Sequence, residues 1–191
     1  MSINQIANGI GLQINNDIFI VTDYSHVKPG KGSAFVRVKL KNVKTNQVIE
    51  RTFKTADKLE DAALEERRMQ NLYNAGESTH FMDLTTFEEV VVDNALLGDS
   101  IRFLQDHLEV TGLFFNNKVL KIILPNFIIA EVTYTEPGLK GDSISGGTKP
   151  ATIDSGANVQ VPLFINIGDR LKIDTRTGEY VERVKNESKR D

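Results

Sequence analysis

The chain has 191 residues, a formal net charge of −3 at pH 7 and a hydrophobic fraction of 40%. This length suggests one domain or two, with enough apolar side chains for a packed core. The net acidity argues against a protein that coats nucleic acid indiscriminately, because such binding depends on summed positive charge. The chain contains no cysteine, which excludes disulfides and thiolate nucleophiles and fits a reducing compartment.

The start of the chain gives no sign of export. Residues 1–5 lack the basic segment followed by an apolar stretch that marks a signal peptide. No run of about 18 apolar residues occurs, so we expect no membrane partner and a cytoplasmic location. The three histidines, His26, His80 and His107, lie far apart in the sequence. Without cysteine, they do not predict a zinc or other metal site.

Short β-branched runs at 18–21, 35–41 and 47–53 predict strands, because turn residues separate them. They indicate a small barrel of hairpins that ends near residue 64. A short helical piece is expected near 58–63, where Asp57 and Glu60 have the spacing of a capping box.

The strand predicted at 35–41 alternates strictly between apolar and basic side chains, so its two faces differ. The apolar face consists of Val36, Val38 and Leu40, and the basic face of Arg37, Lys39 and Lys41.

The loop before this strand is predicted to present one lysine. Pro29 presets φ for the second position of a turn, and Gly30 accepts the positive φ that a type II turn needs next. Lys31 then lies at the far corner, beside Gly32. Turn chemistry alone would explain a solvated lysine there. However, the sequence has no acidic residue between Asp23 and Glu50, and the segment contains six cations: Lys28, Lys31, Arg37, Lys39, Lys41 and Lys44. This local charge favours an anionic partner.

The second block starts with a strand over 67–73, followed by a hairpin turn at 74–76. The ionisable side chains from 77 to 99 are acidic apart from His80. This change of charge indicates a domain boundary near 64. Strands at 108–115 and 118–124, joined by Asn116 and Asn117, predict a second β-barrel.

The third block begins near 129 and contains strands around 158–165, 169–174 and 179–184, before a polar tail at 185–191. The expected domains are therefore 1–64, 65–128 and 129–191.

The sequence offers little for an enzyme. It has no phosphate-binding loop of the usual spacing, no nucleophile elbow and no histidine–carboxylate pair close in sequence. The run from Gly146 to Lys149 looks faintly like a phosphate cradle, but its context is β rather than a helix N-terminus. Phe114, Phe115 and Phe164 are interpreted mainly as core residues, although base stacking is an alternative. We expect no catalytic residue and no cofactor.

Several longer motifs resemble bacterial elongation factor P. The run Lys-Pro-Gly-Lys-Gly-Ser-Ala-Phe-Val-Arg at 28–37 is similar to the tip loop of that family, and 73–83 is similar to its second domain. The C-terminal signature of the family is similar to five segments of this chain, at 137–142, 149–152, 161–164, 167–169 and 172–180. The motifs occur in order along nearly the whole chain.

The resemblance implies an all-β fold of three consecutive barrels in an L-shaped arrangement that mimics tRNA. The first, 1–64, would be an SH3-like (KOW-type) domain, and the other two would be OB-fold domains. It implies a translation elongation factor that binds the 70S ribosome between the peptidyl and exit tRNA sites. Such a factor would position the acceptor end of the P-site peptidyl-tRNA and relieve stalling at consecutive prolines.

The resemblance also assigns roles to residues. Lys31 matches the lysine that a modifying enzyme extends towards the peptidyl-transferase centre. The tip loop comprises Lys28, Pro29, Gly30, Gly32 and Ser33. Ser33 occupies a position that varies in the family, so a lysyl-type group, an aminopentanol-type group and no modification all stay open.

Arg37, Lys39 and Lys41 are predicted to contact tRNA or rRNA phosphates as positioning charges. A monomer is expected. The alternatives are an OB-fold module that binds single-stranded nucleic acid, the elongation-factor-P-like paralogue, and an enzyme that uses the loop around Gly146 and Gly147. The intact Pro-Gly-Lys-Gly loop favours the main factor over the paralogue.

Overall fold

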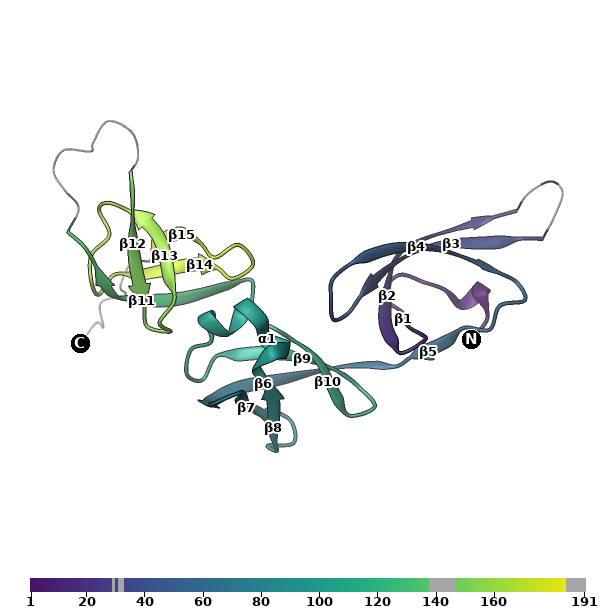
Figure 1. Ribbon diagram of the computed structural model, residues 1–191, viewed down its shortest axis with the longest axis horizontal. Coiled ribbons are helices and arrows are strands. Elements are labelled where there is room, and N and C mark those ends of the chain that lie inside the picture. Colours follow the sequence, from purple (N-terminus) through teal and green to yellow (C-terminus); the bar gives the residue numbers. More distant parts are fainter. Residues whose placement is uncertain (29, 31–32, 138–146, 185–191) are drawn as a thin grey trace, which may run out of the picture. The chain divides into compact units, whose positions relative to one another are not determined.

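The computed structural model describes residues 1–28, 30, 33–137 and 147–184. The described chain is an all-β protein with three five-stranded sheets, which confirms the expected fold class (Figure 1). Two compact units are present, one of Met1–Arg67 with Gly112–Ile122 and one of Arg68–Thr111 with the chain from Ile123. Within the described residues, no helix is long and apolar enough to cross a membrane.

The first sheet is built from the N-terminal hairpins, after a short 3-10 turn η1 (Ile3–Gln5). Its strands are β1 (Gly11–Ile14), β2 (Asp17–Val27), β3 (Phe35–Asn42), β4 (Val48–Lys54) and β5 (Glu60–Ala62), in the order β4-β3-β2-β1-β5. The predicted strands are therefore confirmed, and β2 is longer than predicted. Val36, Val38 and Leu40 are fully buried and form the centre of the barrel core.

The prediction of a short helix near 58–63 is wrong. Residues 60–62 form β5, which pairs with β1 through Gly11 and Ala62. Asp57 does not cap a helix: its carboxylate accepts the backbone N–H of Lys54 at 2.7 Å and closes a turn after β4. Leu59 then enters the barrel core. Tertiary pairing has overridden a local helix propensity, as often happens in short segments.

The second sheet contains two hairpins whose turns were predicted from asparagine and glycine. Its strands are β6 (Leu64–Ala75), β7 (Ser78–Asp83), β8 (Glu89–Asp93), β9 (Glu109–Phe115) and β10 (Lys118–Ile123), in the order β10-β9-β6-β7-β8. Gly76 has a φ of +64°, and Asn116 and Asn117 have φ of +48° and +62°. These left-handed conformations suit the turns of tight hairpins.

An apolar cluster attaches β9 and β10 to the first barrel within one compact unit. Leu113 of β9 and Leu120 of β10 are buried against Ile18, Val43 and Ala62. The β9–β10 hairpin is therefore part of the same packed body as the N-terminal sheet.

The third sheet belongs to the other unit. Its strands are β11 (Phe127–Thr135), β12 (Thr148–Ile153), β13 (Asn158–Pro162), β14 (Arg170–Asp174) and β15 (Glu179–Val184), in the order β13-β12-β11-β14-β15. The predicted strands are present, although β13 ends earlier, at Pro162. The core of this sheet includes Val132, Leu171 and Ile173, which are fully buried.

A buried phenylalanine of that core comes from a segment that precedes the sheet in the chain. The helix α1 (Asn94–Leu97) runs into a 3-10 segment η2 (Gly98–Phe103), and Phe103 packs with the buried residues of the third sheet. A side chain at Gly178 would lie within 3.3 Å of the Phe103 ring. The segment is also tied by Ser155, whose hydroxyl donates to the Arg102 carbonyl at 2.7 Å.

We expect Phe103→Ala to destabilise the second unit strongly. Phe103 is only 1% exposed, and removal of a buried phenylalanine costs about 3–5 kcal/mol. Thermal and urea unfolding monitored by circular dichroism measure the loss. Phe87→Ala is the matched control because Phe87 is 73% exposed, and a surface change is worth about 0.5 kcal/mol or less. Equal effects of the two substitutions would contradict the packing role.

An ion pair at the end of β14 predicts a pH effect. The Asp174 carboxylate accepts bonds from the Arg176 side chain at 2.5 and 3.0 Å and from its backbone N–H at 2.9 Å. These bonds, first those of the guanidinium, lower the pKa of Asp174 from 3.8 to about 2.

Because the folded pKa is depressed, this stabilisation is complete above pH 4 and is lost as the pH falls towards 2. Wild type should melt at a higher temperature than Asp174→Asn at pH 6, with the gap closing between pH 4 and 2. The difference in melting temperature between wild type and Arg176→Gln should close over the same pH range. Melting curves across this pH range test it, and a gap that stays constant down to pH 2 would refute it.

Candidate nucleic-acid interface

The β2–β3 hairpin brings the predicted tip loop to one end of the first sheet. The last paired residues are Val27 and Phe35, and the Thr55 hydroxyl donates to the Ala34 carbonyl at 3.1 Å, which braces this end. Lys28, Gly30 and Ser33 are exposed. The remaining loop residues, Pro29, Lys31 and Gly32, and with them the predicted type II turn, lie outside the described residues.

The two faces of β3 differ as the sequence predicts. Arg37, Lys39 and Lys41 are exposed on the face opposite the core. Strand pairing fixes this orientation, since β3 lies between β2 and β4 in an uninterrupted register with β4. A one-residue slip would bury three charges, so the burial of the apolar face enforces the basic face.

Two of the three cations have acidic partners on the neighbouring strands. Arg37 Nε lies 3.3 Å from a Glu50 carboxylate oxygen, and Lys39 Nζ lies 3.3 Å from an Asp23 carboxylate oxygen. Asp23 and Glu50 are the acids that bound the acid-free segment in the sequence. The sheet brings them beside its centre, so the segment is basic along the chain but partly neutralised in space.

These pairs are weak and exchangeable. All four side chains are about half exposed, and exposed ion pairs contribute roughly 0–1 kcal/mol. Lys41 differs from its two neighbours, because no described carboxylate lies within ion-pair distance of it. It is the uncompensated charge of the row.

A shallow depression of about 220 Å³ runs over the same face. It is lined by Asp23, Tyr24, Ser25, Arg37, Lys39 and Glu50. Near it, the rings of Tyr24 and His26 meet edge to face, with centroids 5.7 Å apart, and both residues are exposed. This aromatic pair was not among the predicted site residues. The alternation Tyr24-Ser25-His26 within an extended strand was the available signal.

The other candidates from the sequence do not form a site. The Lys149 ammonium is buried and donates to the Glu136 carbonyl at 2.6 Å, so it is not part of an open phosphate cradle. Gly146 lies outside the described residues. Phe114 is a core residue as expected, whereas Phe164 is 58% exposed, with the Arg183 guanidinium 5.6 Å from its ring centre.

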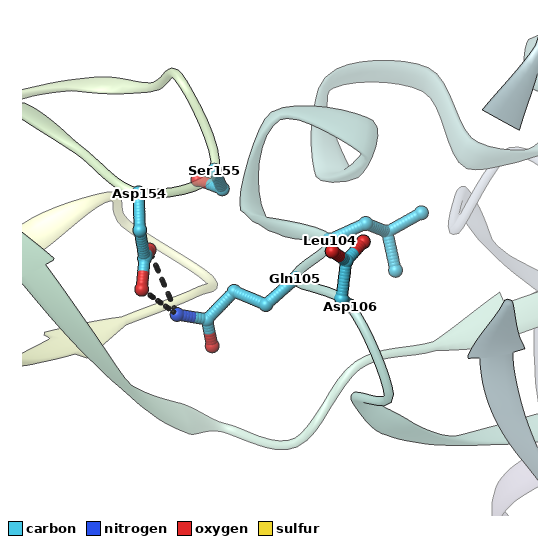
Figure 2. A pocket seen from close by; sticks show the side chains of 5 residues that line it. All are labelled: Leu104, Gln105, Asp106, Asp154 and Ser155. Atoms are coloured by element: carbon cyan, nitrogen blue, oxygen red, sulfur yellow. Dashed lines mark hydrogen bonds between the residues drawn. The ribbon is translucent and has the colours of Figure 1, made fainter. Parts of the chain in front are cut away.

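A hollow of about 470 Å³ in the second unit is lined in part by Gln105 and Asp154, which are hydrogen-bonded to each other (Figure 2). The Gln105 side-chain amide donates to both carboxylate oxygens of Asp154 at 2.9 Å. The backbone N–H of Glu131 also reaches this carboxylate, at 3.3 Å. The carboxylate thus connects the segment of Gln105 to strand β11. Among the described residues, no group of three or more potential metal ligands occurs.

Three family models match the chain. They are the elongation factor P KOW-like domain at residues 2–59, the elongation factor P OB domain at 64–122, and the elongation factor P C-terminal model at 128–183.

Curated relatives match over almost their full length. Elongation factor P of Caldanaerobacter subterraneus subsp. tengcongensis is 49% identical over 92% of this chain and 95% of its own. Elongation factor P of Microcystis aeruginosa is 49% identical over 96% of this chain and 99% of its own. That of Pelotomaculum thermopropionicum is 46% identical over 96% of this chain and all of its own.

Among solved structures, the chain is similar to eukaryotic translation initiation factor 5A from Methanococcus jannaschii, with a TM-score of 0.51 and 25% identity over 64% of this chain and 92% of that one. An initiation factor 5A family protein from Naegleria fowleri shares the fold, with a TM-score of 0.53 and 14% identity over 65% of this chain and 96% of that one. Because the family models follow one another along the chain and the bacterial relatives match it almost end to end, the chain belongs to the elongation factor P family of translation factors.

Proposed function

We propose that the chain binds the ribosome between the peptidyl and exit tRNA sites and stimulates peptide-bond formation at consecutive prolines. The observation that carries this proposal is the 46–49% identity to elongation factor P along nearly the whole chain. The exposed basic face of β3, next to a loop that contains the family's lysine motif, supports it from the residues themselves.

The proposed mechanism needs no acid, base or nucleophile from the protein. Proline is restricted in φ and reacts poorly in the geometry of peptide transfer. A factor that holds the acceptor end of the peptidyl-tRNA in a productive pose can lower the barrier by several kcal/mol through positioning alone. Lys31, extended by a modifying enzyme, would supply the contact nearest the tRNA terminus.

In this proposal the residues behind the tip anchor the factor. Gly30 and Gly32 would let the loop backbone approach RNA closely, and the cations of β3 contact phosphates of tRNA or rRNA. The half-exposed pairs of Arg37 and Lys39 can exchange their carboxylates for phosphates at low cost, because such pairs contribute little in water. A cytoplasmic monomer with domains at 1–64, 65–128 and 129–191 fits this role.

The rival function is a general binder of single-stranded nucleic acid. The exposed Phe164 with its adjacent Arg183 is the observation in its favour, because aromatic and guanidinium groups stack on bases. The rival predicts clear affinity for free oligonucleotides. The proposed factor should instead sediment with ribosomes through a sucrose cushion and bind oligonucleotides weakly.

Lys31→Ala should abolish relief of polyproline pausing while leaving the fold intact. The sequence predicts Lys31 in an exposed turn, and a surface substitution changes stability by about 0.5 kcal/mol or less. A reconstituted translation assay on a message with three consecutive proline codons measures the relief, using protein purified with its native modification.

Lys58→Ala is the matched control, because Lys58 is an exposed lysine of the same unit outside the proposed interface. It should relieve pausing like wild type. Full relief by Lys31→Ala would disprove the role of the tip lysine.

Replacing Arg37 and Lys39 together by glutamine should weaken ribosome binding and flatten its salt dependence. Each lost phosphate contact lowers the slope of log affinity against log salt by about 0.7–0.9. Equilibrium binding of labelled protein to ribosomes, measured from 50 to 200 mM salt, tests this expectation.

The control removes the acidic partners of the same two ion pairs and keeps Arg37 and Lys39. Asp23→Asn with Glu50→Gln should keep the salt slope and tighten binding, because the carboxylates that compete with phosphate are gone. Equal weakening by both double substitutions would show that the ion pairs matter only for the fold.

A further inference from the structure

The turn between β3 and β4 has a well-defined geometry. The Asn42 side-chain oxygen accepts the backbone N–H groups of Lys44 at 2.9 Å and Thr45 at 3.0 Å. The next residue, Asn46, has a φ of +59° and donates its backbone N–H to the Asn42 carbonyl at 3.0 Å. This network fixes where the Asn46 side chain projects.

Lys121 reaches this turn from the β10 strand. Its ammonium donates to the Asn46 side-chain oxygen at 2.6 Å. Both residues belong to the first compact unit. Because Asn46 uses its oxygen to accept from Lys121, its amide nitrogen keeps two N–H donors for another partner.

Lys41 lies on the exposed face of β3, next to this turn, and its charge acts on Lys121. The pKa of Lys121 is lowered, first by partial burial and then by the positive charge of Lys41. Within the part of the chain that the structure describes, neither lysine has a carboxylate at ion-pair distance. Arg37 and Lys39, four and two residues away on the same face, both have one.

Such an arrangement costs stability in the free protein. A partly desolvated ammonium beside another cation is unfavourable unless an anion compensates it. Uncompensated groups of this kind occur preferentially at functional sites. An anion placed between the two ammonium groups would gain both charges and could also accept from the Asn46 amide, as phosphate oxygens do with several donors at once.

We propose that Lys41, Asn46 and Lys121 form a binding site for one phosphate of an RNA backbone. The site deepens the proposed function, on which the RNA partner rests, by adding a contact from β10 to those predicted on β3. Lys121 was not among the predicted residues, because it lies far from the basic segment in the sequence and joins it only through folding.

The test compares Lys41→Gln, Lys121→Gln and the double substitution in ribosome binding from 50 to 200 mM salt. If one phosphate is shared, each single variant should reduce the affinity, and the deficit should shrink by about threefold across this range. The double variant should lose little more than either single one. Lys118→Gln, an exposed lysine of the same strand, should resemble wild type.

Folding is checked separately. Lys121→Gln removes a like charge and keeps a donor for Asn46, so its melting temperature should not fall. A destabilised variant with weaker binding would count against the site, because the loss would then follow from the fold.

A direct readout does not depend on ribosomes. The pKa of the Lys121 ammonium, measured by NMR, should rise when a short single-stranded RNA is added in the large excess that weak binding requires. A response to inorganic phosphate without a response to RNA would indicate a small-anion site and overturn the proposal.

Different results would overturn the proposed function and the proposed phosphate site. Wild type that does not bind ribosomes would overturn the proposed function, and the RNA titration of Lys121 would then decide on the site alone. Wild type that binds with a steep salt dependence, with Lys121→Gln equal to Lys118→Gln, would overturn only this site.

Discussion

The strict alternation along β3 is the constraint on which the rest depends. Val36, Val38 and Leu40 are fully buried in the first barrel. Since successive side chains of a strand point to opposite faces, this burial places the three basic residues on the outside. The same strand therefore supplies the centre of a core and the basic face that is proposed to bind RNA. The burial of the apolar residues thus fixes the outward orientation of the basic ones, which explains how a mildly acidic protein maintains a localised basic face.

The cations on that face differ in whether a carboxylate lies beside them. Asp23 and Glu50 neutralise the two cations nearer the tip, in pairs that water and salt weaken. Lys41, at the other end of the row, has Lys121 nearby instead of an acid. Carboxylates on neighbouring strands keep part of the surface from attracting any polyanion, and the uncompensated end offers a site where a phosphate gains most. This pattern fits the proposed RNA partner.

Packing between segments distant in sequence organises both units. Leu113 and Leu120 join the β9–β10 hairpin to the first barrel, and this attachment brings Lys121 to the β3–β4 turn. In the other unit, Phe103 at the end of η2 packs into the core of the third sheet. In both cases a few buried side chains decide which surfaces become neighbours, since apolar burial is the main source of stability.

The sequence by itself determined the all-β class, most strands, the asparagine turn at Asn116 and Asn117, and the two faces of β3. These features depend on local periodicity and on turn chemistry, which neighbouring residues encode. Only the tertiary structure decided that residues 60–62 pair as a strand, that Asp23 and Glu50 neutralise part of the basic segment, and that Lys121 reaches Asn46 in the β3–β4 turn. Each of these depends on which strands become neighbours, and that choice is made by the burial of side chains far apart in the chain.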